Sequence, residues 1–215
     1  MKSNSYSGNG IVLLGRDHAA LSLLIPLHSR VENPFILDCT FNKGGMWKKC
    51  DYQPNIRMDL RLLPKIDTVG DFTALPFKSE TFDIVVFDPP HLPNAAGSRK
   101  SSKMWWDRYG LTDMGRDGDN VVSLFYPFFL EARRVLKPKG IVLAKIADLV
   151  HNHRYQWQQV ALVLAAQEAG MTPCDMLIKA DPNAGKLKSS KWQNQKHLRK
   201  SHCYWIVVRN SKYCE

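Results

Sequence analysis

Apolar and polar residues follow two patterns along the chain. Short, largely apolar runs, typical of strands buried on both faces, occur at 35–38, 55–60, 82–88, 141–146, 172–178 and 202–209. Apolar residues at helical spacing occupy 19–31, 123–137 and 155–169. Strands that alternate with helices in this way predict an α/β protein whose sheet is mostly parallel.

Three of the predicted strands end on an acidic residue, namely Asp38, Asp59 and Asp88. Ligands of open α/β sheets bind at the carboxyl ends of the strands, so these acids mark a candidate site. Pro89 and Pro90 follow Asp88, and because proline has no N–H to continue a central ladder, the chain must leave the sheet there. Taken alone, this tripeptide would also fit an ordinary turn between a strand and a loop.

The run Asp88-Pro89-Pro90-His91 resembles the D-P-P-[aromatic] motif of class I (Rossmann-like) S-adenosylmethionine-dependent amino-methyltransferases of the DNA/RNA N-methyltransferase type. The resemblance implies that the Asp88 carboxylate and the Pro89 carbonyl, in a rigid turn, accept the two N–H bonds of an exocyclic amine. Such contacts favour a pyramidal nitrogen and free its lone pair for attack on a methyl sulfonium. His91 stands where the family usually has Tyr, Phe or Trp. It would stack on the base, and it leaves the identity of that base open.

The segment 34–45 is similar to the cofactor loop of the same family, an acid followed by spaced glycines. The resemblance implies that Asp38 faces the methionine amino group of the cofactor and that Gly44 and Gly45 pass beneath it. Asn42 stands where the family usually has an earlier glycine. Asparagine tolerates left-handed torsions better than most residues, so the turn can form.

Two later segments continue the family's order. By the resemblance, Asp59 would accept hydrogen bonds from both ribose hydroxyls, which suits a carboxylate. The run 70–90 matches in order and spacing, with Asp71 implied to accept from the adenine amine and Phe72 to pack on the ring. The cofactor-binding residues implied for S-adenosylmethionine are Asp38, Thr40, Asn42, Gly44, Gly45, Asp59, Asp71 and Phe72.

The whole order of motifs extends to Arg-Val-Leu-Lys-Pro-x-Gly, which ends at Gly140 and leads into the fifth strand. The resemblance therefore implies an α/β, Rossmann-like fold with a seven-stranded, mostly parallel sheet, an antiparallel last strand and helices on both faces. We expect a single methyltransferase domain over residues 1–215, of which residues 1–15 are flexible.

Positive charge predominates, with 30 Lys and Arg against 20 Asp and Glu and a net charge of +10. This excess favours a polyanionic partner, DNA or RNA. Basic and aromatic residues gather at 92–120 and 179–201, which we interpret as substrate-facing insertions suited to phosphate contact and base stacking. A mobile surface loop and a solvated charged face are the alternatives. The substrate-binding candidates are Arg99, Lys100, Lys103, Trp105, Trp106, Lys188, Lys191, Trp192, Lys196, Arg199 and Lys200.

Other kinds of site and of protein have less support. The five cysteines show no C-x-x-C spacing, which predicts neither a disulfide framework nor a zinc cluster and favours a reducing cytoplasm. His151 and His153 have no Cys or carboxylate at metal spacing and are interpreted as surface or helix-entry residues. Apolar runs are far shorter than the roughly 18 residues of a membrane span. We therefore expect a cytoplasmic protein with neither metal nor membrane partner.

These observations together predict an N-methyltransferase that uses S-adenosylmethionine and acts on an exocyclic base amine of nucleic acid. We favour adenine N6 as the target, in DNA rather than in RNA. A duplex substrate would require the base to flip out. One alternative is a protein or small-molecule N-methyltransferase. Another is a nucleic-acid-binding relative without catalysis, because Asn42 and His91 depart from the family's pattern. The oligomeric state is not predicted.

Overall fold

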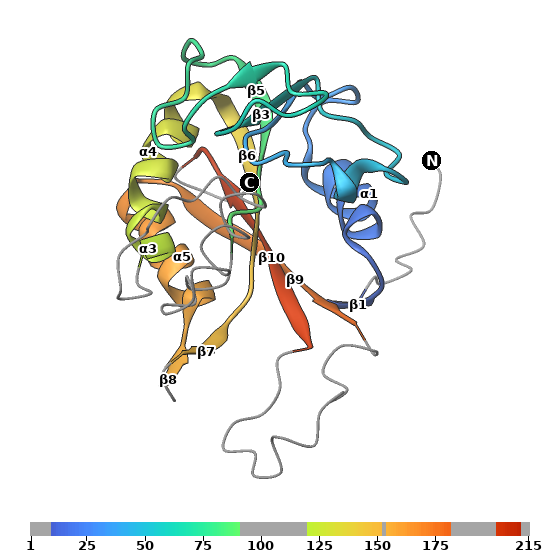
Figure 1. The fold of residues 1–215 in the computed structure, drawn as a ribbon, viewed down its shortest axis with the longest axis vertical. Coiled ribbons are helices and arrows are strands. Elements are labelled where there is room, and N and C mark those ends of the chain that lie inside the picture. The colour runs from blue at the N-terminus through green and yellow to red at the C-terminus, as the bar shows by residue number, and fades with distance from the viewer. Residues whose placement is uncertain (1–9, 91–119, 152–153, 182–200, 212–215) are drawn as a thin grey trace, which may run out of the picture.

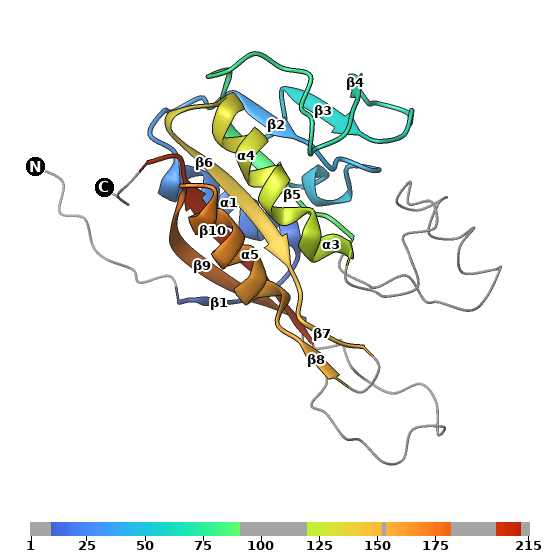
Figure 2. The ribbon, with the colours of Figure 1, turned by 90° about the vertical axis from the view of Figure 1, so that its left-hand side faces the viewer.

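An eight-stranded sheet forms the centre of the protein (Figures 1 and 2). The computed structural model describes residues 10–90, 120–151, 154–181 and 201–211. From one edge of the sheet to the other, the strands are β1 (Val12–Leu14), β9 (Thr172–Ala180), β10 (His202–Arg209), β6 (Leu136–Ile146), β5 (Phe82–Phe87), β2 (Ile36–Asp38), β3 (Ile56–Asp59) and β4 (Thr68–Val69).

The predicted antiparallel last strand is confirmed, because β10 runs antiparallel to both of its neighbours while every other adjacent pair in the sheet is parallel. The predicted count of seven strands is wrong. Strand β1 is the eighth, and it lies within the segment 1–15 that we expected to be flexible. It pairs with Ile178–Ala180 of β9 and so covers an edge whose N–H and C=O groups would otherwise be unpaired.

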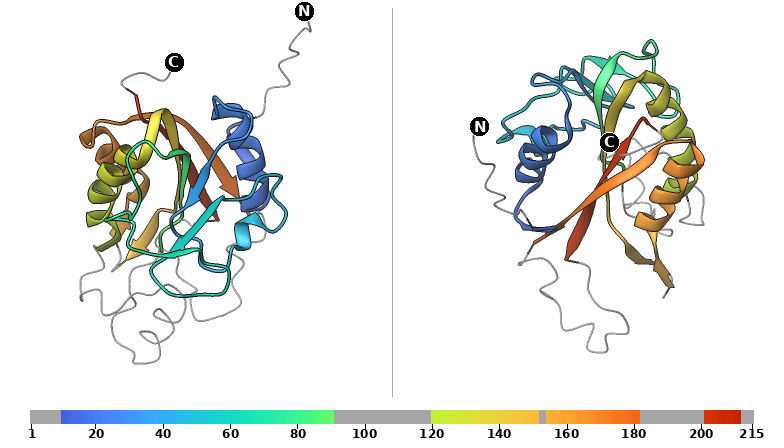
Figure 3. Two further views of the ribbon diagram at one scale, coloured as in Figure 1. Left: turned by 90° about the horizontal axis from the view of Figure 1, so that it is seen from above. Right: turned by 180° about the vertical axis from the view of Figure 1, so that it is seen from behind.

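Helices cover both faces of the sheet, as predicted (Figure 3). Helix α1 (Asp17–His28) and the short 3₁₀ helix η1 (Gly45–Trp47) pack on one face. Helices α3 (Asn120–Ser123), α4 (Phe125–Val135) and α5 (Gln158–Glu168) pack on the other. Two apolar cores therefore hold the sheet between helical layers.

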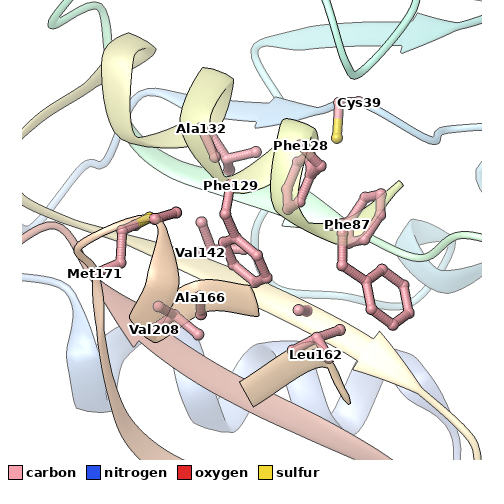
Figure 4. Packing of buried hydrophobic residues seen from close by; sticks show 14 of the residues in the cluster. Cys39, Phe87, Phe128, Phe129, Ala132, Val142, Leu162, Ala166, Met171 and Val208 are labelled. Atoms are coloured by element: carbon pink, nitrogen blue, oxygen red, sulfur yellow. The ribbon is translucent and has the colours of Figure 1, made fainter. Parts of the chain in front are cut away.

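The core beneath α4 and α5 is rich in phenylalanine (Figure 4). The ring of Phe87, the last residue of β5, stacks on Phe128 of α4 with centroids 3.7 Å apart. Phe72 meets Phe87 edge-on at 5.1 Å. Both Phe87 and Phe128 are fully buried. Because interiors pack as closely as organic crystals, this aromatic contact fixes the end of β5, where Asp88 follows.

A hairpin of β7 (Leu149–His151) and β8 (Arg154–Gln156) precedes α5, in a place where we expected a helix from residue 155. The helix instead begins at Gln158. The buried Asp148 carboxylate accepts hydrogen bonds from the Tyr155 hydroxyl at 2.9 Å and the Gln159 N–H at 3.0 Å. These bonds tie the hairpin to the first turn of α5. His151 lies in β7 rather than at the entry to a helix, and His153 is outside the described residues.

Candidate active site at the carboxyl edge of the sheet

Parallel pairing brings the strand-end acids to one edge of the sheet. Asp38 lies opposite Val86 in the register of β2 and β5, two residues before Asp88. Asp59 lies opposite Val69 in the register of β3 and β4, two residues before Asp71. The four acids therefore line the carboxyl edge, as the sequence predicted for ligand binding in an open sheet.

Asp38 is fully buried and both of its carboxylate oxygens accept hydrogen bonds. The Trp47 indole N–H donates to Oδ2 at 2.6 Å, and the Thr40 backbone N–H donates to Oδ1 at 2.9 Å. Burial raises the pKa of Asp38 to about 7, although both hydrogen bonds oppose the rise. Trp47 was not among the predicted site residues. It lies in the short segment after Gly45, and the pattern of that segment does not show which side chain points inward.

Stability should depend on pH through Asp38. Its folded pKa of about 7 lies above the ordinary value of 3.8, so between these values the folded chain holds a proton that the unfolded chain has released. The contribution of this proton to the free energy of unfolding is complete below pH 3.8 and is lost as the pH rises through about 7. The free energy of unfolding, measured in urea without ligand, should therefore fall across this range relative to Asp38→Asn, by a few kcal/mol at about 1.4 kcal/mol per pKa unit. A difference that does not vary with pH would contradict a titrating, buried Asp38.

Thr40 links the carboxyl ends of β2 and β5. Its hydroxyl accepts a hydrogen bond from the Asp88 backbone N–H at 2.8 Å and lies 3.4 Å from Asp38 Oδ1, to which it donates. The Asp38 loop and the Asp88-Pro89-Pro90 turn are thus held at a fixed separation. This contact explains a threonine two residues after the end of β2, between two loops that we expected to serve cofactor and substrate.

The loop after β2 adopts the left-handed torsions that we expected. Asn42 has φ +51° and Gly44 has φ +62°. A Cβ on Gly44 would meet the Phe41 ring, so this glycine is needed for close packing within the loop. At Gly45, by contrast, a Cβ would meet nothing within 4 Å. The loop is therefore filled on the Phe41 side and open above Gly45.

Asp59 is buried and binds groups of its own chain. Arg61 donates to Oδ1 from Nε at 3.1 Å and from its backbone N–H at 3.0 Å, and the Asn42 N–H donates to Oδ2 at 2.9 Å. Arg61 Nη2 also donates to the Asn42 side chain at 3.2 Å. Arg61 was not among the predicted site residues, because nothing in its spacing distinguishes it from a surface arginine.

Asp71 and Phe72 follow β4 and differ in exposure. Asp71 is exposed, and its Oδ1 accepts hydrogen bonds from the Thr73 N–H and hydroxyl, both at 2.8 Å. Phe72 is half-buried, with its ring directed edge-on against Phe87 at 5.1 Å and Phe128 at 6.0 Å. Part of the Phe72 ring is therefore used by the core.

Asp88 lies beside a largely buried lysine of the predicted fifth strand. Lys145 of β6 contacts Asp88 Oδ2 at 3.1 Å and Asp17 Oδ2 at 3.1 Å. Burial lowers the pKa of Lys145, but Asp88, Asp17 and further contacts outweigh it and raise that pKa overall. Asp17 is the first residue of α1, after the N-cap Arg16, and pairs with Lys145 and Lys179. Pro89 is buried after Asp88.

Several predicted residues lie outside the described part of the chain. They include His91 of the Asp-Pro-Pro motif and every substrate-binding candidate, namely Arg99, Lys100, Lys103, Trp105, Trp106, Lys188, Lys191, Trp192, Lys196, Arg199 and Lys200. Their roles stay predictions. Asp88, Pro89, Pro90 and all eight cofactor-binding candidates lie within the described part, at the carboxyl ends of β2 and β3 or in the segments that follow β2, β4 and β5.

The described residues contain no group of three or more His, Cys, Asp or Glu that could hold a metal ion. They also contain no helix long and apolar enough to cross a membrane. Cys39, Cys50 and Cys203 are free thiols, whereas Cys174 is disulfide-bonded, which the spacing of the cysteines did not predict.

No protein-family model and no curated protein matches the chain. Among solved structures, a candidate methyltransferase from Bacillus halodurans is similar with a TM-score of 0.52 and 15% identity, over 90% of this chain and 99% of that one. A candidate sarcosine dimethylglycine methyltransferase from Galdieria sulphuraria gives 0.51 and 13%, over 91% and 84%. A candidate DNA modification methylase from Thermus thermophilus gives 0.43 and 14%, over 66% and 52%, so this chain spans about half of that methylase's length. The third score is too low to support an argument. The first two show that the chain has the α/β fold of these methyltransferase structures.

Proposed function

We propose that the protein is an S-adenosylmethionine-dependent N-methyltransferase that acts on an exocyclic base amine of nucleic acid, with adenine N6 in DNA favoured over RNA. The observation that carries the proposal is the position of Asp88-Pro89-Pro90 at the carboxyl end of β5, joined through Thr40 to the Asp38 loop. A substrate site and a cofactor loop would have to be adjacent in this way for a methyl group to pass between them.

The residues at the edge fit the cofactor by their chemistry. When bound, S-adenosylmethionine supplies a methyl group on a positively charged sulfur. Asp38 would hold the amino group of its methionine part, and that cation would favour the ionised form of the Asp38 carboxyl. Asp59 would accept from the ribose hydroxyls, since each carboxylate oxygen has more than one acceptor site. The open space above Gly45 leaves room for a ligand against the backbone of the loop.

Asp88 has the central chemical role. Its carboxylate would accept one N–H of the amine while the Pro89 carbonyl accepts the other, which directs the nitrogen lone pair toward the methyl group. The carboxylate would also stabilise the positive charge that develops on the nitrogen during transfer. The fully buried Phe87 and the buried Pro89 flank Asp88 and limit its movement.

The net charge supports nucleic acid as the substrate. A net charge of +10 attracts phosphates and gains free energy through the release of counterions. The basic and aromatic residues of 92–120 and 179–201 would contact the backbone and stack on bases. Strands β9 and β10, which flank the second segment, meet at His202 and Ala180, beside the end of β6. The second segment would therefore leave the sheet on the side where Asp88 lies.

One observation favours a second candidate, a nucleic-acid-binding relative without catalysis. Both oxygens of Asp38 and both oxygens of Asp59 already accept hydrogen bonds from Trp47, Arg61 and the loop backbone. A protein that had lost its cofactor could fill the site in this way. Binding of S-adenosylmethionine to the purified protein separates the two candidates.

The proposed activity is tested by incubating the purified protein with methyl-labelled S-adenosylmethionine and separate pools of unmodified DNA, RNA and total protein. Each pool is then digested to nucleosides or peptides. We expect label in N6-methyladenine, recovered as the deoxyribonucleoside. Label in N4-methylcytosine or in the ribonucleoside would correct the base or the polymer. Label only in protein, or none despite measured cofactor binding, would contradict the proposal.

A further inference from the structure

Four charged side chains form a row of successive ion pairs that begins at Asp88 of the Asp-Pro-Pro turn. We call it the charged row, and it consists of Asp88, Lys145, Asp17 and Lys179. Successive members lie 3.1, 3.1 and 3.0 Å apart, and their signs alternate. Its members come from the end of β5, from β6, from α1 and from β9, in that order. Its formal charge is zero, so the row contributes to the local field at Asp88 through the arrangement of its members.

Lys145 is the member whose position needs explaining. It follows Ile141–Ala144 in a central strand, and its side chain is only 13% exposed. A buried ammonium group costs several kcal/mol in desolvation unless it is paired, and an apolar side chain at this position would avoid that cost. The carboxylates of Asp17 and Asp88 both contact the Lys145 ammonium group and compensate its charge. Stability alone therefore gives no reason for a lysine at this position.

The register places Lys145 next to the reacting end of the sheet. Phe87 lies opposite Ala144, so Asp88, the residue after β5, comes beside Lys145 of β6. A second lysine of β6, Lys137, pairs with Asp83 of β5 at 2.9 Å at the amino end of the same two strands. The pair of strands thus has one ion pair at each end, and only one of them contacts the proposed catalytic carboxylate.

We propose that Lys145 is a positioning residue that holds the Asp88 carboxylate in place and in its ionised form for the acceptor amine. The inference rests on the proposed function. When the new N–C bond forms and the C–S bond breaks, the positive charge passes from sulfur to nitrogen and leaves as a proton. A carboxylate that is already protonated could neither stabilise this charge nor take up the proton. A cation 3.1 Å away favours the ionised form.

The charged and titratable groups around Asp88 and Lys145 come from every neighbouring element. Within the described ranges they include Asp17 on α1, Lys179 on β9, Cys203 on β10 and Asp38 on β2. Burial raises the pKa of the Cys203 thiol, so Cys203 stays neutral near pH 7. Asp17 and Lys179 offset each other's charge. Lys145 is a cation in direct contact with Asp88, at 3.1 Å.

The test compares kcat as a function of pH for wild-type protein, Lys145→Met, Lys145→Arg and the matched control Lys137→Met. In K145M we expect kcat at neutral pH to fall about 10- to 100-fold, by analogy with the loss of an outer-shell partner that orients a ligand at a metal site. The acid limb of the profile should move upward by about one to two pH units, because Asp88 loses its neighbouring cation. K145R should recover most of the activity. K137M should leave kcat and the acid limb unchanged.

Asp17→Asn gives a second measurement that does not depend on the folding of K145M. It leaves Lys145 paired with Asp88 alone and removes a nearby negative charge, so the acid limb should move downward, opposite to K145M. Methyl transfer by wild type together with unchanged acid limbs in K145M and D17N would overturn the inference and leave the proposed function intact. Absence of transfer by wild type would overturn both.

Discussion

Replacement of Asp88 by alanine should reduce kcat for methyl transfer by about 10²- to 10³-fold, the effect of removing one preorganised electrostatic contact to a transition state. The carboxylate would otherwise accept an amine N–H and stabilise the charge that develops on nitrogen. Cofactor affinity should change little, because the loops of Asp38 and Asp59 are held by their own hydrogen bonds. Single-turnover transfer and equilibrium binding of S-adenosylmethionine measure the two quantities separately.

Asp83→Ala is the matched control for this variant. Asp83 lies at the amino end of the same strand, where it pairs with Lys137 and accepts the Phe35 N–H at 2.9 Å. Its loss should lower stability without changing the rate of transfer. If Asp88→Ala lost cofactor binding as well as transfer, Asp88 would have a structural role and the catalytic assignment would fail.

Replacement of Phe128 by alanine should lower the free energy of unfolding by about 3–5 kcal/mol, the usual cost of removing a buried phenyl ring. Phe128 is fully buried, stacks on Phe87 at 3.7 Å and contacts Phe72 and Phe129 at 6.0 and 5.1 Å. The cavity would lie between α4 and the end of β5. Urea unfolding, followed by far-ultraviolet circular dichroism, gives the change.

Tyr126 on the same helix provides the control, since its side chain is 39% exposed. Tyr126→Ala should change stability by about 0.5 kcal/mol or less, as surface substitutions usually do. Equal losses in the two variants would mean that α4 does not bury its Phe128 face against β5.

The sequence predicted those elements whose patterns are long and continuous. The apolar runs that became β5 and β10 are buried through most of their length, and the amphipathic segment that became α4 buries one face. Their patterns therefore reflect the environment directly. The three short strands β1, β7 and β8 were missed. Each has only three residues and exists because a neighbouring strand or turn completes it.

The acidic residues of the site could be predicted from the sequence, but the side chains that bind them could not. A carboxylate at a strand end is visible in sequence, because the end of an apolar run marks the edge of the sheet. Trp47 on Asp38, Arg61 on Asp59 and Lys145 on Asp88 are contacts that depend on how loops and strands pack in three dimensions. Lys145 in particular lies in the apolar run 141–146, whose pattern predicts a strand and does not distinguish this lysine.

The central claim is that the carboxyl edge of the sheet binds S-adenosylmethionine, and hydrogen–deuterium exchange with and without this cofactor tests it most directly. We predict slower exchange in peptides that cover 38–47, 59–61 and 69–73, which carry the cofactor-binding residues, with no change at 79–83 and 133–139 on the opposite edge. Protection confined to the opposite edge, or no protection at saturating cofactor, would contradict the account.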